Sequence, residues 1–215
     1  MKLTPRLPSR TTLAILALAG SSLLAGCAPL MVGGAMAGTV ATVTDRRSSA
    51  TQLEDQGIEV KALRPIRDIG GDAANISALS YNRHVLLTGE VPSAEVRQRI
   101  EDEVRRIDTV THVTNDLVVM PKAPLSSRSK DALISTKVKA ALIENRDVQS
   151  GVFKVYTERG TVYLLGRVTD LEGRIAVELA RNVTGVERVV KMFEVITPEE
   201  ARRLAPGTNP PDAPR

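Results

Sequence analysis

The chain has few aromatic residues and almost no cysteine. Its 215 residues include no tryptophan, two phenylalanines, three tyrosines, two histidines and one cysteine. So few aromatic rings argue against a base-stacking platform for single-stranded nucleic acid. We therefore expect no nucleic-acid partner. One cysteine also excludes a disulfide within the chain, even in an oxidising compartment.

A strong excess of positive charge is also missing. The formal net charge of +4 comes from 29 basic and 25 acidic residues. Cleavage before Cys27 would remove Lys2, Arg6 and Arg10 and leave 26 basic residues against 25 acidic ones. A mature chain with a net charge of +1 lacks the broad positive field that attracts nucleic acids.

The N-terminus is typical of an exported lipoprotein. After the three basic residues, the apolar run of residues 11–25 is shorter than the roughly 20 residues of a membrane span. It ends in Leu24-Ala25-Gly26-Cys27, which resembles the lipobox of bacterial lipoproteins. We predict a signal peptide at 1–26 and lipidation (a palmitate-type modification) of Cys27, whose acyl chains would anchor the protein. Because Ala28 and not aspartate follows the cysteine, the resemblance predicts an outer-membrane location on the periplasmic face.

An internal repeat fills the middle of the chain. Residues 85–91 match residues 162–168, and residues 110–113 match residues 186–189. The apolar periodicity of the second copy predicts the order helix, strand, strand, helix, strand, with a hairpin turn at Glu158-Arg159-Gly160. A three-stranded mixed sheet packed on two helices is the natural solution for this α+β pattern, αββαβ.

The first copy matches less well at its start. Ile58 and Ala62 align with Ile134 and Val138 of the second copy. Pro65 and the pair Gly70-Gly71 follow, and both features interrupt helices. The first domain is therefore predicted to lack a clear full first helix.

The repeat and the proline-rich stretches together predict the domain organisation. After the signal peptide we expect a lipidated tether at 27–50, a first domain at 51–121, a linker at 122–128, a second domain at 129–197, and a disordered proline-rich tail at 198–215.

The strand at residues 162–168 is apolar on both faces. Val162 and Leu164 lie on one face, and Tyr163 and Leu165 lie on the other. Two helices cover only one face of a sheet, and a strand that is apolar on both faces needs cover on both. We predict that the open face of the second domain packs on the first domain; the alternative is that Tyr163 and Leu165 are partly exposed.

These repeats resemble BON domains, which are small α/β modules of bacterial envelope proteins. The resemblance of the repeats rests on residues 162–168 and on Gly185-Val186-Glu187-Arg188-Val189; the stretch Thr44-Asp45-Arg46-Arg47 resembles the dual-BON outer-membrane lipoproteins. Two such copies behind a lipobox resemble the dual-BON outer-membrane lipoproteins. The resemblance implies a non-enzymatic role in outer-membrane integrity, binding of anionic phospholipid by the second domain, accumulation at division sites, and links to the β-barrel assembly machinery.

The first helix of the second domain has residues suited to a membrane surface. Lys130, Leu133, Ile134 and Lys137 share one side of that helix. Basic residues around apolar ones can lie on an anionic bilayer, so we predict binding of phosphatidylglycerol or cardiolipin there. The family places an aromatic residue where this chain has Leu133. In the alternative interpretation Ile134 belongs to the core and the lysines are a solvated helix face.

No catalytic constellation or cofactor motif is present in the sequence. His84 and His112 have no cysteine or carboxylate at metal-ligand spacing, so we predict no metal, no cofactor and no enzymatic activity. The leading hypothesis is a lipid-anchored periplasmic module that binds anionic phospholipid and supports outer-membrane integrity. The alternative is a protein-interaction adaptor for outer-membrane assembly, with no phospholipid recognition beyond its acyl anchor.

Overall fold

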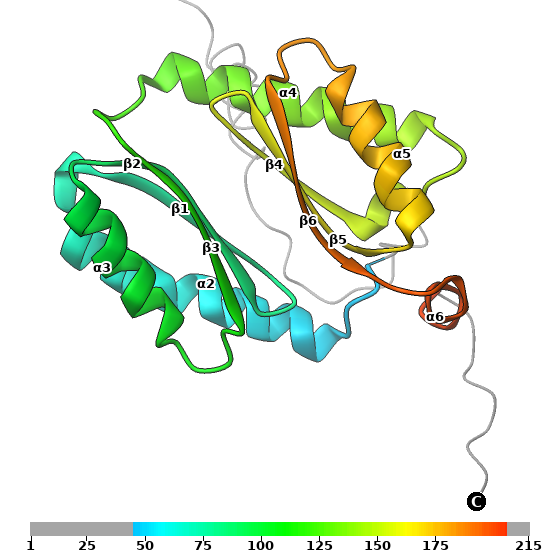
Figure 1. The fold of residues 1–215 in the computed structure, drawn as a ribbon, viewed down its shortest axis with the longest axis horizontal. Helices are drawn as coiled ribbons and strands as arrows, with labels where there is room; N and C mark the ends of the chain where they lie inside the picture. The colour runs from blue at the N-terminus through cyan, green and yellow to red at the C-terminus, as the bar shows by residue number, and fades with distance from the viewer. Residues whose placement is uncertain (1–44, 206–215) are drawn as a thin grey trace, which may run out of the picture. The chain divides into compact units, whose positions relative to one another are not determined.

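Two three-stranded sheets organise residues 45–205, which are the residues that the computed structural model describes. The predicted signal peptide, Cys27, most of the predicted tether and residues 206–215 lie outside the described residues. Each sheet belongs to one copy of the repeat, and in each copy two helices cover one face of the sheet (Figure 1). The predicted α+β class and the two-domain repeat are confirmed.

The two domains have the same order of elements. The first domain contains α2 (Ser49–Gly70), β1 (Asn75–Tyr81), β2 (His84–Val91), α3 (Ala94–Arg105) and β3 (His112–Val119). The second contains α4 (Leu125–Glu144), β4 (Phe153–Glu158), β5 (Thr161–Val168), α5 (Asp170–Arg181) and β6 (Arg188–Val195), followed by α6 (Pro198–Arg203). Short 3-10 helices at Gly71–Ala73 and Ser150–Val152 lead into β1 and β4.

The middle strand of each sheet pairs antiparallel with the strand before it and parallel with the strand after it. β2 lies between β1 and β3, and β5 lies between β4 and β6. Two-residue turns close both hairpins, at Asn82-Arg83 and at Arg159-Gly160, and all four residues have positive φ. This is the turn geometry that matches the twist of paired strands, and it confirms the turn predicted in the second domain.

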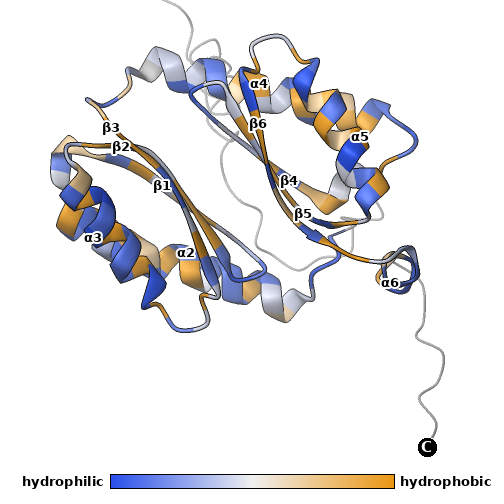
Figure 2. Ribbon diagram, in the orientation of Figure 1, coloured by the Kyte–Doolittle hydropathy of each residue, from blue (hydrophilic) through white to orange (hydrophobic). Residues whose placement is uncertain are grey.

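Each domain has its own hydrophobic core between its helices and its sheet. Hydrophobic colour concentrates along the strands, whereas the helices mix hydrophobic and hydrophilic residues (Figure 2). Ile58 and Ala62 of α2 are buried in the first core, and the aligned Ile134 and Val138 of α4 are buried in the second. The alignment of the two copies is therefore confirmed at their first helices.

The prediction that the first domain lacks a full first helix is wrong. α2 runs for 22 residues and contains Pro65 within its length. A proline inside a helix costs about 3 kcal/mol because it removes one backbone hydrogen bond. Beyond Pro65, Ile66 and Ile69 pack against the first core, and we attribute the continuation of the helix to this packing.

Two helix starts differ from the predicted boundaries. α4 begins at Leu125, inside the segment predicted as a linker. α6 begins at Pro198, where a disordered tail is predicted. The Thr197 hydroxyl accepts a hydrogen bond from the Glu200 backbone, and Pro198 follows at the first helical position. Thr-Pro-x-Glu is a helix-start signal that the sequence interpretation overlooked.

The open faces of the two sheets pack on each other through a third apolar cluster. Tyr81 and Leu86 from the first domain join Tyr163, Leu165 and Met192 from the second. Leu86, Tyr163 and Leu165 are each at most 1% exposed. The predicted packing of the apolar second face of β5 on the first domain is thus confirmed, and it produces a sheet-on-sheet core.

Polar contacts surround this cluster and include the segment before α2. Arg46 forms a two-pronged ion pair with Glu172 at 2.8 Å and also donates to the carbonyl of Arg167. The Lys154 ammonium lies 2.8 Å from the Glu59 carboxylate, across the two domains. Asp116 of β3 accepts hydrogen bonds from Tyr163 and from Arg188. Charge pairs therefore fix how the two sheets are aligned.

Placing a charge in the shared apolar cluster should uncouple the two domains. For Leu165→Asp we expect a loss of at least about 3 kcal/mol of unfolding free energy, because an unpaired carboxylate would be buried. Calorimetry should show one cooperative transition for the wild type and two transitions for the variant. Leu171→Asp, at a 57% exposed position in the same domain, is the control and should unfold like the wild type. An unchanged melting profile for Leu165→Asp would contradict the packing.

Candidate functional site

The four residues predicted to bind phospholipid line one hollow on the second domain. Lys130, Leu133, Ile134 and Lys137 of α4 border a hollow of about 630 Å³. The hairpin turn between β4 and β5 and the turn between α5 and β6 close its other sides. The structure therefore brings together all four residues and adds two loops distant in sequence.

The four residues differ in exposure. Leu133 is 62% exposed and both lysines are exposed, whereas Ile134 is only 8% exposed and belongs to the second core. Ile134 packs against the backbone of Gly185, where an added Cβ would lie 3.1 Å from its Cδ1 atom. Ile134 thus forms the floor of the hollow, while Lys130, Leu133 and Lys137 form the accessible rim.

Asp131 holds the hairpin turn beside α4. Its carboxylate is buried and accepts hydrogen bonds of 2.9 Å from the backbone amides of Arg159 and Gly160. Those bonds fix the backbone of Arg159, whose side chain lines the same hollow as the lysines and donates to the Met120 sulfur at 3.4 Å. The local sequence therefore builds a third cation into the site through a buried acid.

The charge of the hollow is positive but not uniformly so. Lys130, Lys137 and Arg159 line it, and so does the exposed carboxylate of Glu187. The buried carboxylate of Asp131 also lines the hollow, but both of its oxygens accept hydrogen bonds from backbone amides. An exposed leucine among three cations can bury an apolar side chain in a bilayer while the cations face anionic head groups.

The corresponding surface of the first domain lacks this combination. The 76-residue offset that aligns Ile58 with Ile134 places Glu54 opposite Lys130 and Gly57 opposite Leu133. Of the exposed residues Lys130, Leu133 and Lys137, only Lys137 has a matching residue in the first domain, Lys61. The first helix of the first domain therefore has neither the exposed leucine nor the paired cations at these positions.

Sequence reasoning missed Arg159 and the acids that fix both turns. The signal was present in the repeat, because Asp55 and Asp131 are 76 residues apart. Asp55 accepts hydrogen bonds of 2.8 Å from the backbone amides of Asn82 and Arg83, just as Asp131 does for the second turn. A repeated acid aligned with a repeated turn predicts this contact.

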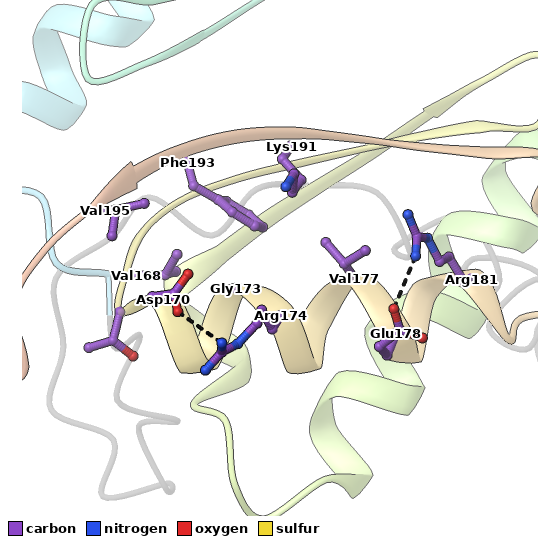
Figure 3. Close-up of a pocket in the computed structure, with 11 residues that line it drawn as sticks. Val168, Asp170, Gly173, Arg174, Val177, Glu178, Arg181, Lys191, Phe193 and Val195 are labelled. Carbon is purple, nitrogen blue, oxygen red and sulfur yellow. Dashed lines mark hydrogen bonds and ion pairs between the residues drawn. The ribbon is translucent and has the colours of Figure 1, made fainter.

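A second hollow, of about 440 Å³, lies between α5 and β6 (Figure 3). Phe193, Val168 and Val177 supply apolar side chains to it, and Phe193 approaches α5 at Gly173, where an added Cβ would lie 3.1 Å from the ring. Two ion pairs run along α5, Arg174 with Asp170 at 3.3 Å and Arg181 with Glu178 at 3.0 Å. β6 is the last strand of its sheet, so its outer edge pairs with no described strand.

The sequence matches a known family in both copies of the repeat. The BON domain model matches residues 66–121 and 130–197. The chain belongs to the BON-domain family. We call the domain of α2 to β3 BON1 and the domain of α4 to β6 BON2.

Two relatives extend the comparison beyond the BON domains. The outer membrane lipoprotein DolP of Haemophilus influenzae is 35% identical over 187 residues, which cover 86% of this chain and 95% of the relative. The 21 kDa hemolysin of Actinobacillus pleuropneumoniae is 31% identical over 157 residues, which cover 71% of this chain and 79% of that protein.

The chain is a dual-BON, DolP-like lipoprotein of the outer membrane, as the sequence predicts. The similarity to DolP covers 86% of this chain and 95% of the relative, and Leu24-Ala25-Gly26-Cys27, which resembles a lipobox, lies ahead of the matched BON domains. Within residues 45–205, no helix is long and apolar enough to cross a bilayer.

Of the two acids that hold the hairpin turns, Asp55 of BON1 accepts more hydrogen bonds than Asp131 of BON2. Burial alone would raise its pKa, but hydrogen bonds from Ser80, from the amides of Arg83 and Asn82, and from Arg47 hold the pKa below its usual value. The residue is 2% exposed. Its ionised form therefore stabilises the fold.

We expect Asp55 to make the stability of the protein sensitive to acid. Because folding lowers its pKa, its contribution is complete above the unfolded-state pKa of about 3.9 and is lost as the pH falls through the lower folded value. Asp55→Asn should lower the unfolding free energy by about 1–3 kcal/mol at pH 7 and flatten its decline below pH 4 in urea titrations. Asp68→Asn, at an exposed position of the same helix, is the control. An equally steep decline in Asp55→Asn would contradict this role.

Proposed function

We propose that this protein is a non-enzymatic, lipid-anchored periplasmic module that binds anionic phospholipid through BON2 and supports outer-membrane integrity. The single observation that carries the proposal is the hollow on α4, where exposed Leu133 lies among Lys130, Lys137 and Arg159. Phosphatidylglycerol and cardiolipin are the expected ligands. By resemblance to its family, the protein would act at division sites.

The physical argument combines two small effects. Each lysine or arginine near an anionic surface contributes about 1 kcal/mol, and burying an exposed leucine contributes roughly 1.5–3 kcal/mol. Leucine lacks the amphipathic ring that favours the interface, so the cations carry a larger share of the binding than they would beside an aromatic residue.

The proposed anchor makes such weak binding sufficient. Removal of residues 1–26 and acylation of Cys27 would hold the protein at the bilayer, since each buried CH₂ contributes about 0.8 kcal/mol. BON2 would then bind from a high local concentration. Affinity that is modest in solution becomes effective at the membrane.

A protein-interaction adaptor remains the second candidate function, and the hollow between α5 and β6 favours it. An extended peptide could pair with the free edge of β6 and place an apolar side chain against Phe193. The apolar second face of β5 no longer favours an adaptor, because BON1 covers it. In this alternative the partner would belong to the β-barrel assembly machinery, and only the acyl chains would touch lipid.

Liposome sedimentation tests the lipid-binding proposal. The chain from residue 27 onward, with Cys27→Ser, should bind vesicles that contain phosphatidylglycerol or cardiolipin, and binding should weaken with salt. The triple variant Lys130/Leu133/Lys137→Ala should lose about 3 kcal/mol of binding free energy, or roughly a hundredfold in affinity. Glu187→Gln, which removes the opposing charge, should bind more tightly.

The matched control is a triple variant of BON1. Lys61, Leu63 and Arg64 are exposed on α2, and changing them to alanine removes two cations and one exposed leucine. This control should bind like the parent. Equal loss in both triple variants would indicate non-specific attraction, and no binding by the parent would leave the adaptor as the function.

A further inference from the structure

The two histidines of the chain lie side by side on BON1. His84 begins β2, His112 begins β3, and the parallel pairing of these strands makes them direct partners. Their ring centroids are 5.6 Å apart, with the ring planes tilted by 53°. Twenty-eight positions separate them in the chain, so only the parallel sheet reveals the pair.

This spacing suits two imidazoles that share one metal ion. A metal–nitrogen bond of about 2.0–2.1 Å places each ring centroid about 3.2 Å from the metal. Two such rings at angles between about 90° and 120° have centroids roughly 4.5–5.6 Å apart. The observed separation of 5.6 Å lies at the upper end of this range.

The fold already orients His84 for such a role. Its Nε2 atom lies 2.8 Å from the Thr114 hydroxyl, which leaves Nδ1 as the nitrogen for a ligand. Metal-binding histidines commonly have their other nitrogen fixed in this way.

The pair opens into a hollow with room for further ligands. The hollow measures about 360 Å³ and is also lined by Asn82, Met192, Glu194 and the cation Arg83, which pairs with Glu54. Glu194 is already engaged, because it accepts a hydrogen bond from Asn82 and pairs with Arg167. In the described part of the chain no three histidine, cysteine or acidic side chains form a metal-holding group, so water would fill the remaining positions.

We propose that His84 and His112 bind a divalent transition-metal ion, with copper(II) preferred over zinc(II). Imidazole nitrogen suits both ions, a nitrogen and oxygen ligand set favours the tetragonal geometry of copper(II), and copper(II) forms the stronger complexes in the divalent series. Magnesium, which requires oxygen ligands, is not expected to bind.

Titration calorimetry with copper(II), zinc(II) and magnesium chlorides tests the site. The protein is the tag-free chain from residue 27 onward, with Cys27→Ser, which keeps both BON domains and removes a competing thiol. Copper(II) should bind one site per chain. His112→Asn, at an exposed position, should weaken this binding at least tenfold, and His84→Asn should do the same.

Two further measurements keep the result unambiguous. The copper electron-paramagnetic-resonance spectrum should show two imidazole nitrogens in the parent and one in His112→Asn. Thr111→Ala, which changes a neighbouring residue of the same hollow, should leave the affinity unchanged, and circular dichroism should show that each variant is folded. Equal copper affinity in the parent and in the double histidine variant, or no copper binding by the parent, would overturn the proposal.

Discussion

The apolar second face of the two middle strands is the constraint on which the rest of the structure depends. β2 and β5 each bury one face under helices, and Leu86, Tyr163 and Leu165 remain on the other. Neither sheet could leave such residues in water without a large exposed apolar patch. Packing the two faces together joins two small cores into one larger assembly. The helices are thereby left on the outside, where α4 can meet a ligand.

Charge pairs then tie the membrane-proximal end of the chain to this assembly. Arg46, which lies within the segment predicted as a tether (27–50), is 6% exposed and pairs with Glu172 of BON2. Arg47 pairs with Asp55 and lies over the Tyr81 ring. A buried ion pair contributes little net stability but is costly to break. These contacts therefore favour one arrangement of the segment that leaves the anchor over many loose ones.

Much of this architecture could be predicted from local pattern. The repeat, the Arg159-Gly160 turn and the cover over Tyr163 follow from periodicity, and the four rim and floor residues of α4 follow from helical spacing. The predictions failed where contacts between residues distant in sequence determine the structure. Packing of Ile66 and Ile69 carries α2 past Pro65, and parallel pairing brings His112 beside His84. Arg159 lines the α4 hollow from a turn whose backbone Asp131 holds.

The central claim is that Leu133 enters the anionic bilayer from a cationic rim. Cys27 is the only natural cysteine, so Cys27→Ser with Leu133→Cys offers one position for an environment-sensitive fluorophore. We predict a blue shift and protection from aqueous quenchers with phosphatidylglycerol vesicles, and neither with zwitterionic ones. The same label at Leu63→Cys, a 59% exposed position of BON1, should not respond. No response at position 133, or equal responses at both positions, would contradict the account.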